Sequence, residues 1–436
     1  MSLDRIATLR RLYGGSLVTT ATRLIDVPCR YGMHLLIALR LSLEEVGAFY
    51  IVFGALMVAS GLGRLGIDRA VTREMARLLA AHDTAGARQV LRRAAAQVAL
   101  LSLLLTAGAM AAAWPLAAWV MHKPAMAPLF MIGALAIVPQ NLANLVAGAL
   151  AGLHRVTQSQ IVYTWLWPGL FCVIAVVLPL TDAVALFAVV VAMTIATIVG
   201  AVMLLRDLPP AGTPATPATS LLGTGLSLFS LELVQLLISA APPFILGALA
   251  PTDEVGLYAI AWRVVLVIYM FVSGVASMMS PRFARLYVLD DRIGLKREAG
   301  RALGFALALA LGPILVVTLW PERILQLFGP HFAPAAPALR ILLIGQLAAA
   351  LTTTTPELLG MTGYARSLLH INTLAALILI GGLTVLCPWF GAQGAAIATT
   401  ATMLINAAGT SFMAQRKLGF VPLTALFAEG RRARLA

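Results

Sequence analysis

The sequence predicts an all-α membrane protein, with twelve transmembrane helices in two parallel six-helix lobes around a central cavity. Three observations predict this fold. Hydrophobic residues make up 60% of the 436-residue chain and charged residues only 11%, whereas a soluble domain is far more polar. Long stretches, such as 124–153 and 371–415, contain no Asp, Glu, Lys, Arg or His. Motifs of the first half also recur in the second half.

The apolar stretches set the positions of the helices, because a spanning helix needs about 20 mostly apolar residues. Proline and glycine inside such stretches are tolerated in membranes. We expect helices at 14–39, 46–67, 90–114, 126–152, 157–180, 183–205, 221–249, 255–280, 299–320, 334–360, 365–387 and 394–415. Most of the 31 Lys and Arg gather at one end of these helices, so the positive-inside rule places both termini in the cytoplasm.

Three internal matches predict the repeat. "EEVGAFY" at 44–50 recurs as "DEVGLYA" at 253–259, and "AGLHR" at 151–155 loosely matches "LGMTG" at 359–363. Trp114-Pro115 and Pro124 likewise recur as Trp320-Pro321 and Pro330. We therefore expect an N-terminal lobe at 1–205, a Pro- and Thr-rich linker at 206–220 and a C-terminal lobe at 221–436. Six helices per lobe is an even number, so the lobes enter the membrane from the same side, which suits alternating access.

A polar stripe interrupts the first predicted helix. Arg23, Asp26, Arg30 and His34 fall at i, i+3, i+7 and i+11, which places them on one helix face. Each charge at mid-membrane costs roughly 2.5–3.5 kcal/mol on insertion scales, so these groups must face water, a partner or a ligand.

The seventh helix carries a corresponding stripe. The shift of 209 residues relates Arg23 to Glu232 and Asp26 to Gln235, and the eighth helix adds Arg263. We expect the two stripes to face the central cavity. Three arginines against two carboxylates leave a surplus of guanidinium, which suits a phosphate-bearing anion.

These residues allow two interpretations. In the first, substrate binds to Arg23, Arg30, Arg263, Gln235 and His34, while Asp26 and Glu232 balance charge or bind a coupling ion. In the second, Asp26 pairs with Arg23 or Arg30, Glu232 pairs with Arg263, and the pairs only hold the lobes together. His34 is either a proton switch or a packing residue.

Other motifs are weaker. "GLGRLG" at 61–66 has no strand before it, so we do not expect a nucleotide site. The segment 68–83 predicts a basic amphipathic helix on the inner surface, in contact with anionic lipid. Gln140, Asn141 and Asn144 either line the cavity or bond to neighbouring helices, and we expect Glu357 to be structural. We see no catalytic pair, metal-spaced His/Cys set or phosphate loop, so we predict neither an enzyme nor a cofactor. The basic residues lie in short patches between apolar runs, which excludes nucleic acid.

Three further stretches carry a resemblance to a known family: "RLSLEEVGAFYIVFG" at 40–54, "LGIDRAVTRE" at 65–74 and "PWFGAQGAAIATT" at 388–400. Together they make the chain similar to bacterial polysaccharide flippases of the multidrug/oligosaccharidyl-lipid/polysaccharide exporter (MOP) superfamily. The count of twelve helices favours the O-antigen type of oligosaccharide flippase over the fourteen-helix lipid II flippases.

The resemblance implies a multi-pass transporter of the bacterial inner membrane. It would move undecaprenyl-diphosphate-linked oligosaccharide to the outer leaflet, for lipopolysaccharide or exopolysaccharide synthesis, alongside a polymerase and other assembly proteins. In lipid II flippases, arginines on helices 1 and 8 face the cavity, and Arg23, Arg30 and Arg263 lie on the matching helices. The alternatives are a drug or small-cation antiporter of the same superfamily, or a non-transporting scaffold of a polysaccharide assembly complex.

Overall fold

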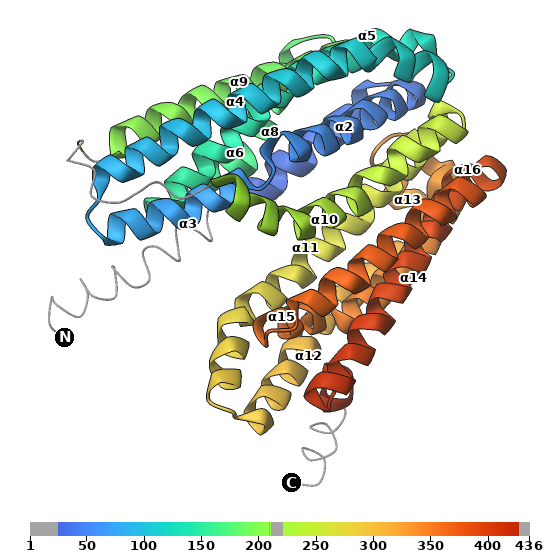
Figure 1. Ribbon diagram of the computed structural model, residues 1–436. Coiled ribbons are helices and arrows are strands. Elements are labelled where there is room, and N and C mark those ends of the chain that lie inside the picture. The colour runs from blue at the N-terminus through green and yellow to red at the C-terminus, as the bar shows by residue number, and fades with distance from the viewer. Residues whose placement is uncertain (1–24, 209, 211–220, 427–436) are drawn as a thin grey trace, which may run out of the picture. The chain divides into compact units, whose positions relative to one another are not determined.

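The computed structural model describes residues 25–208, 210 and 221–426. These residues form helices and turns, with no strand among them, which confirms the all-α fold (Figure 1). Within this part of the chain, nine helices are long and apolar enough to cross a membrane. Many large apolar side chains on them point outward, including Leu103, Leu104 and Leu205, each more than half exposed. Such outward apolar surface is what a lipid-facing helix requires.

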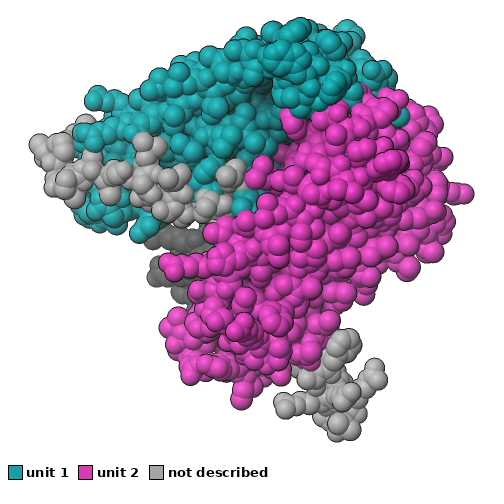
Figure 2. Space-filling model, turned by 45° about the vertical axis from the view of Figure 1, so that its right-hand side comes forward, with its two compact units in different colours: residues 1–236 teal, residues 237–436 magenta. Residues whose placement is uncertain are grey.

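The chain forms two compact units, residues 1–236 and residues 237–436 (Figure 2). The boundary falls inside α10 (Leu221–Leu249), so the first part of this helix belongs to unit 1. Unit 1 also contains a helical segment at 25–40, followed by α2 (Leu43–Arg64), α3 (Ile67–Ala80), α4 (Thr84–Pro115), η1 (Leu116–Val120), η2 (Pro124–Met126), α5 (Ala127–Leu135), α6 (Ile137–Gly152), α7 (Val156–Gln160), η3 (Ile161–Trp165), α8 (Leu166–Val177) and α9 (Asp182–Asp207).

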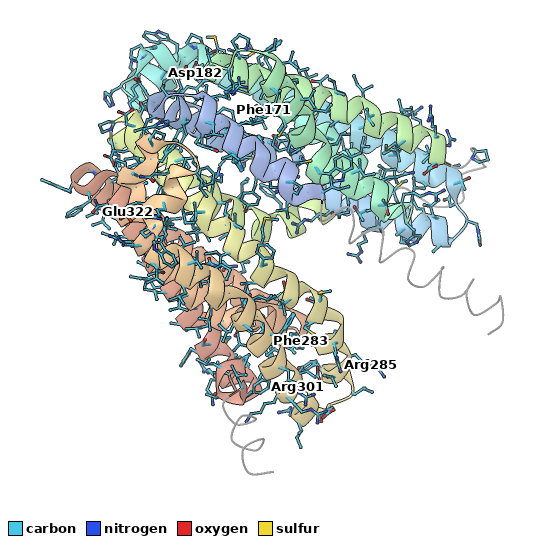
Figure 3. All side chains as sticks on the ribbon, turned by 180° about the vertical axis from the view of Figure 1, so that it is seen from behind. Phe171, Asp182, Phe283, Arg285, Arg301 and Glu322 are labelled. Carbon is cyan, nitrogen blue, oxygen red and sulfur yellow. The ribbon has the colours of Figure 1, made fainter. Side chains whose placement is uncertain are left out.

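Unit 2 repeats this pattern of long helices with short connections. After α10 it contains α11 (Thr252–Val288), α12 (Arg292–Leu319), α13 (Pro321–Gln326), η4 (Pro330–Ala335), α14 (Ala336–Thr352), α15 (Thr354–Met361) and α16 (Ala365–Leu418). Arg285 and Arg301 lie at one end of this unit and Glu322 at the other, as the order of α11, α12 and α13 requires (Figure 3).

The observed helices differ from the predicted ones mainly where a long helix is broken. The helix predicted at 334–360 divides at Thr353 into α14 and α15. The helices predicted at 365–387 and 394–415 are the two arms of α16, which turns at Gly391 (φ 51°, ψ −128°). With these arms counted separately, and with the segment 25–40 and α10 added to the nine spans, the number of helices reaches the predicted twelve.

The third long helix of each unit begins with the same cap. Asp83 accepts a hydrogen bond from the backbone N–H of Gly86 (2.7 Å), and Asp291 accepts one from Gly294 (2.8 Å). The residue before each cap has a left-handed backbone conformation, with φ 57° at His82 and 49° at Asp290. α4 and α12 therefore start six or seven residues before the apolar runs, which is why the predictions at 90 and 299 were late.

Other connections repeat as well. His154 (φ 58°) ends the turn after α6, and Gly363 (φ 89°), 209 residues later, ends the turn after α15. Pro124 and Pro330 each open a 3-10 helix, η2 and η4, that leads into the next α-helix. The repeat read from the sequence is thus present in the local structure of each unit.

The structure shows which face of segment 68–83 packs against the protein. α3 ends at Ala80, and its apolar side chains, including Ile67, Val71 and Met75, are buried in the protein against α4 and α6. α6 approaches closely, since a Cβ at Gly148 would lie 2.6 Å from the carbonyl oxygen of Asp68. The apolar face of α3 is therefore part of the protein core and does not enter the bilayer. Contact of its basic face with anionic lipid stays a prediction.

Candidate functional site

The polar stripe of the first helix contains an ion pair. Arg30 Nη2 lies 3.1 Å from Asp26 Oδ1, and Arg30 Nε also donates to that oxygen at 3.3 Å. The Asp26 side chain is 13% exposed and that of Arg30 is 40% exposed, so the carboxylate lies behind a guanidinium that still reaches the surface. Of the two pairings left open by the sequence, the structure contains Asp26–Arg30; Arg23 lies outside the described residues.

His34 continues the stripe but is buried. Its Nδ1 lies 2.8 Å from the hydroxyl oxygen of Tyr50 on α2, and both rings are almost fully enclosed. The contact attaches the segment 25–40 to α2. His34 here has the packing role that the sequence left open, and its contact with substrate stays a prediction.

Two cysteines fix the other side of the same segment. The sulfur of Cys29 lies against Gly169, and the sulfur of Cys172 lies against Gly32, at 3.4 and 3.5 Å from the position of a Cβ. Each thiol thus fills the space left by a glycine of the opposite helix, so the segment 25–40 packs closely on α8. Both thiols are free. Contacts on two sides hold the Asp26–Arg30 pair in place.

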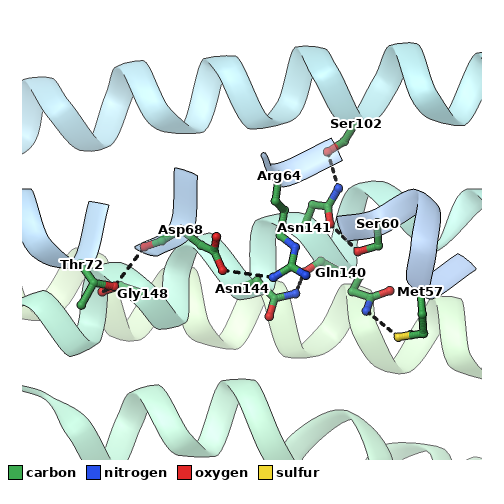
Figure 4. A network of polar contacts seen from close by, with 10 residues as sticks. All are labelled: Met57, Ser60, Arg64, Asp68, Thr72, Ser102, Gln140, Asn141, Asn144 and Gly148. Carbon is green, nitrogen blue, oxygen red and sulfur yellow. Dashed lines mark hydrogen bonds and ion pairs between the residues drawn. The ribbon is translucent and has the colours of Figure 1, made fainter. Parts of the chain in front are cut away.

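A second polar cluster lies inside unit 1, between α2, α3, α4 and α6 (Figure 4). Arg64 Nη1 donates to Asp68 Oδ2 at 3.1 Å, and the two side chains are only 10% and 13% exposed. Breaking such a buried pair by removing one partner costs about 3–5 kcal/mol. The sequence analysis missed this pair, because Arg64 reads as an ordinary basic residue at the end of a spanning helix.

Asn141 is the centre of the uncharged part of this cluster. Its Nδ2 donates to Ser102 Oγ at 2.8 Å, and its Oδ1 accepts from Ser60, so one amide joins α6 to α4 and α2 (Figure 4). All three residues are fully buried. Gly63 permits this approach, since a Cβ there would lie 2.5 Å from Asn141 Nδ2. Gly63 of "GLGRLG" therefore serves helix packing, whereas Gly66 (φ 72°) forms the left-handed turn before α3.

The neighbouring amides make similar contacts. Gln140 Nε2 donates to the sulfur of Met57 at 3.3 Å, and Asn144 Nδ2 donates to the Gln140 carbonyl at 2.8 Å. Gln140 and Asn141 thus bond to neighbouring helices, whereas Asn144 bonds to the backbone of its own helix. Whether any of the three also lines a cavity stays a prediction.

In unit 2, Arg263 lies on α11 and is partly buried. Five residues before it, the hydroxyl groups of Tyr258 and Thr399 are hydrogen-bonded at 2.9 Å, which joins α11 to α16. Ser280 donates to Glu357 Oε2 at 2.8 Å, so Glu357 joins α15 to α11, as a structural residue would. Glu232 and Gln235 lie on α10, but their side chains are outside the described residues.

Of the described site residues, Arg30 offers a partly exposed guanidinium backed by a largely buried carboxylate, and Arg263 is also partly exposed. A guanidinium can bind an anion through its remaining N–H groups, most strongly a phosphate. The Arg64–Asp68 pair and the Asn141 hydrogen bonds join neighbouring helices of unit 1 and stabilise their packing.

Comparisons with known proteins agree with this architecture. The family model described as polysaccharide biosynthesis protein matches residues 12–287, and the MatE family model matches residues 229–386. No curated protein matches the chain.

Solved structures of MOP-superfamily transporters share the fold. An inward-facing multidrug-resistance MATE transporter superposes with a TM-score of 0.75 at 16% identity, covering 90% of this chain and 94% of the other. A MOP transporter from Pyrococcus furiosus, described as having a binding pocket of reverse polarity that suggests a different function, gives 0.62 at 18% identity and covers 93% of both chains. An outward-facing MATE transporter gives 0.61 at 17% identity, covering 92% of this chain and 95% of the other.

The match over residues 12–287, the helical architecture and these neighbours lead to one conclusion: the chain belongs to the polysaccharide biosynthesis protein family and is a multi-pass membrane transporter of the MOP superfamily.

Proposed function

We propose that this transporter moves an undecaprenyl-diphosphate-linked oligosaccharide from the cytoplasmic to the outer leaflet of the bacterial inner membrane. The observation that carries the proposal is the family match over residues 12–287, a stretch that includes Arg30 and Arg263. The termini then lie in the cytoplasm, the side that the basic helix ends select.

The chemistry of Arg30 fits this substrate. Its guanidinium is partly exposed and is held by a buried Asp26, so it is oriented before any ligand arrives. An incoming diphosphate competes with the carboxylate for N–H donors, and Arg is the side chain best suited to bind two phosphate oxygens at once. Arg23 and Arg263 supply further positive charge, Gln235 and His34 supply polar contacts to the head group, and Glu232 balances the charge of the empty site. The polyprenyl tail stays in the bilayer throughout.

A drug or small-cation antiporter is the second candidate. The MatE match over residues 229–386 and the MATE transporters among the structural neighbours favour it. A cation site would need a carboxylate without a cationic partner, whereas Asp26, the described carboxylate of the polar stripe, pairs with Arg30.

Reconstitution tests the choice directly. The purified protein is placed in liposomes that carry a fluorescent polyprenyl-diphosphate oligosaccharide in one leaflet, and the rate of its appearance in the other leaflet is measured. Parallel liposomes carry a proton or sodium gradient and a cationic dye. We expect lipid translocation without dye efflux. Dye efflux that depends on the gradient, with no lipid translocation, would establish the antiporter. The absence of both activities would indicate a scaffold.

A further inference from the structure

Three arginines form a row on the outer face of α3. Arg69, Arg73 and Arg77 are spaced four residues apart, so they follow one another along one face at intervals of about 6 Å. All three are exposed, while the opposite face of α3 is buried among apolar side chains of α4 and α6. We call these three residues the α3 arginine row.

Close contacts with α6 fix the position of the α3 arginine row. Thr72 Oγ1 donates to the carbonyl oxygen of Gly148 at 2.9 Å, and a Cβ at Gly152 would lie 2.9 Å from the carbonyl oxygen of Thr72. Arg77 pairs with the buried Glu74 at 2.7 Å; this hydrogen bond, and then the charge of Glu74, raise the pKa of Arg77. Arg77 therefore stays fully charged.

The exposed face of α4 shows where the lipid head groups lie. Arg92 and Arg93 are exposed, and seven residues after Arg93 the exposed side chains become purely apolar at Leu100, Leu103 and Leu104. Seven residues of helix span about 10 Å, close to the roughly 5–8 Å of the polar layer on each side of a bilayer. The change from arginine to leucine along one helix face therefore marks the boundary between head groups and hydrocarbon.

α3 packs beside this same stretch of α4. Its buried residues share a cluster with Ala87, Val90, Ala94 and Val98, which bracket Arg92 and Arg93. The α3 arginine row consequently lies along the head-group layer, where the available ligands are lipid phosphates.

We propose that the α3 arginine row is a binding site for anionic phospholipid head groups of the cytoplasmic leaflet. The exposed arginine side chains bind the lipid phosphates. The apolar face of α3 does not contact lipid because it is buried in the protein core. Binding is electrostatic and weakens as salt is added. The site is independent of the transported substrate.

The test measures the affinity of the purified full-length protein in neutral detergent for short-chain phosphatidylglycerol, with short-chain phosphatidylcholine as the uncharged comparison. The variant Arg69→Gln/Arg73→Gln/Arg77→Gln removes the row. The control Arg285→Gln/Arg292→Gln/Lys296→Gln removes the same charge from exposed positions at the α11–α12 turn of unit 2. Arg→Lys at the three α3 positions keeps the charge and reports on folding. Farnesyl diphosphate serves as a probe for a polyprenyl substrate.

We expect the α3 variant to bind phosphatidylglycerol at least about tenfold more weakly, while the control and the Lys variant stay within about threefold of the wild type. Unchanged phosphatidylglycerol binding in a folded α3 variant overturns the proposal, as does equal affinity of the wild type for phosphatidylcholine. A loss confined to farnesyl diphosphate would assign the row to the transported lipid and also overturn it.

Discussion

Asp26 lies behind Arg30 on the same helix, with its carboxylate 3.1 Å from Arg30 Nη2 and largely hidden while the guanidinium reaches the surface. The pair explains how an apolar segment accommodates an arginine: the carboxylate offsets the charge, and the guanidinium remains available to a stronger anion. If Arg30 binds the diphosphate as proposed, Asp26 competes with the substrate for its N–H groups.

Replacing Asp26 with Asn removes that competition. We expect Asp26→Asn to bind a polyprenyl diphosphate more tightly, by up to about fivefold, since a partly exposed ion pair contributes about 0.2–1 kcal/mol. Transport should slow, because the diphosphate then leaves Arg30 less readily. Titration with a fluorescent polyprenyl diphosphate measures the affinity. A weaker affinity, together with a smaller yield of folded protein, would instead assign the pair a purely structural role.

Removing one partner of the Arg64–Asp68 pair should destabilise unit 1. Arg64→Met leaves a buried carboxylate and is expected to cost about 3–5 kcal/mol, whereas Arg64→Met with Asp68→Leu should recover most of the loss. Thermal unfolding in detergent compares the single and double variants. Arg73→Met, at an exposed position on α3, is the control and should unfold like the wild type. Equal stability of Arg64→Met and wild type would show that the pair is not buried as described.

Gly391 is needed for the turn of α16. At φ 51° and ψ −128°, an added Cβ would lie 2.5 Å from the carboxylate of Glu254, which accepts the N–H of Ala392 at 2.7 Å. We expect Gly391→Ala to cost about 1–3 kcal/mol of stability. Gly381→Ala, on the first arm of the same helix with open space around it, is the matched control and should lose nothing. Thermal unfolding of both variants measures the difference. Equal unfolding temperatures would show that a Cβ at Gly391 does not strain the turn.

The two caps should behave alike if the halves are true repeats. Asp83→Ala and Asp291→Ala each remove the acceptor for a glycine N–H at the start of α4 and α12. Each should cost about 0.5–2 kcal/mol. Asn at either position keeps an acceptor and should restore stability. A large loss at one cap and none at the other, measured by thermal unfolding, would contradict the equivalence of the two motifs.

Apolar runs, basic helix ends and internal matches were enough to predict the helices and the repeat, because hydrophobic length and turn chemistry are local properties of the sequence. The polar first turns of α4 and α12 were not predicted, because the helices were located by their apolar residues alone and each begins at a cap several residues earlier. The burial of Arg64 also escaped, because it depends on how closely α6 approaches at Gly63 and Gly148. The stripe at Asp26 and Arg30 was visible, since charges inside an apolar segment stand out.

The most direct test of the proposed function is the translocation rate of a polyprenyl-diphosphate oligosaccharide in liposomes containing Arg30→Ala. A charge-assisted hydrogen bond is worth about 1.5–3 kcal/mol, so the variant should translocate at least about tenfold more slowly. Lys should restore only part of the rate, because a point charge lacks the planar fork. The control is Arg340→Ala, at an exposed arginine that pairs with Glu322 at 2.8 Å, and it should transport normally. A wild-type rate in folded Arg30→Ala would contradict the claim that Arg30 binds the diphosphate.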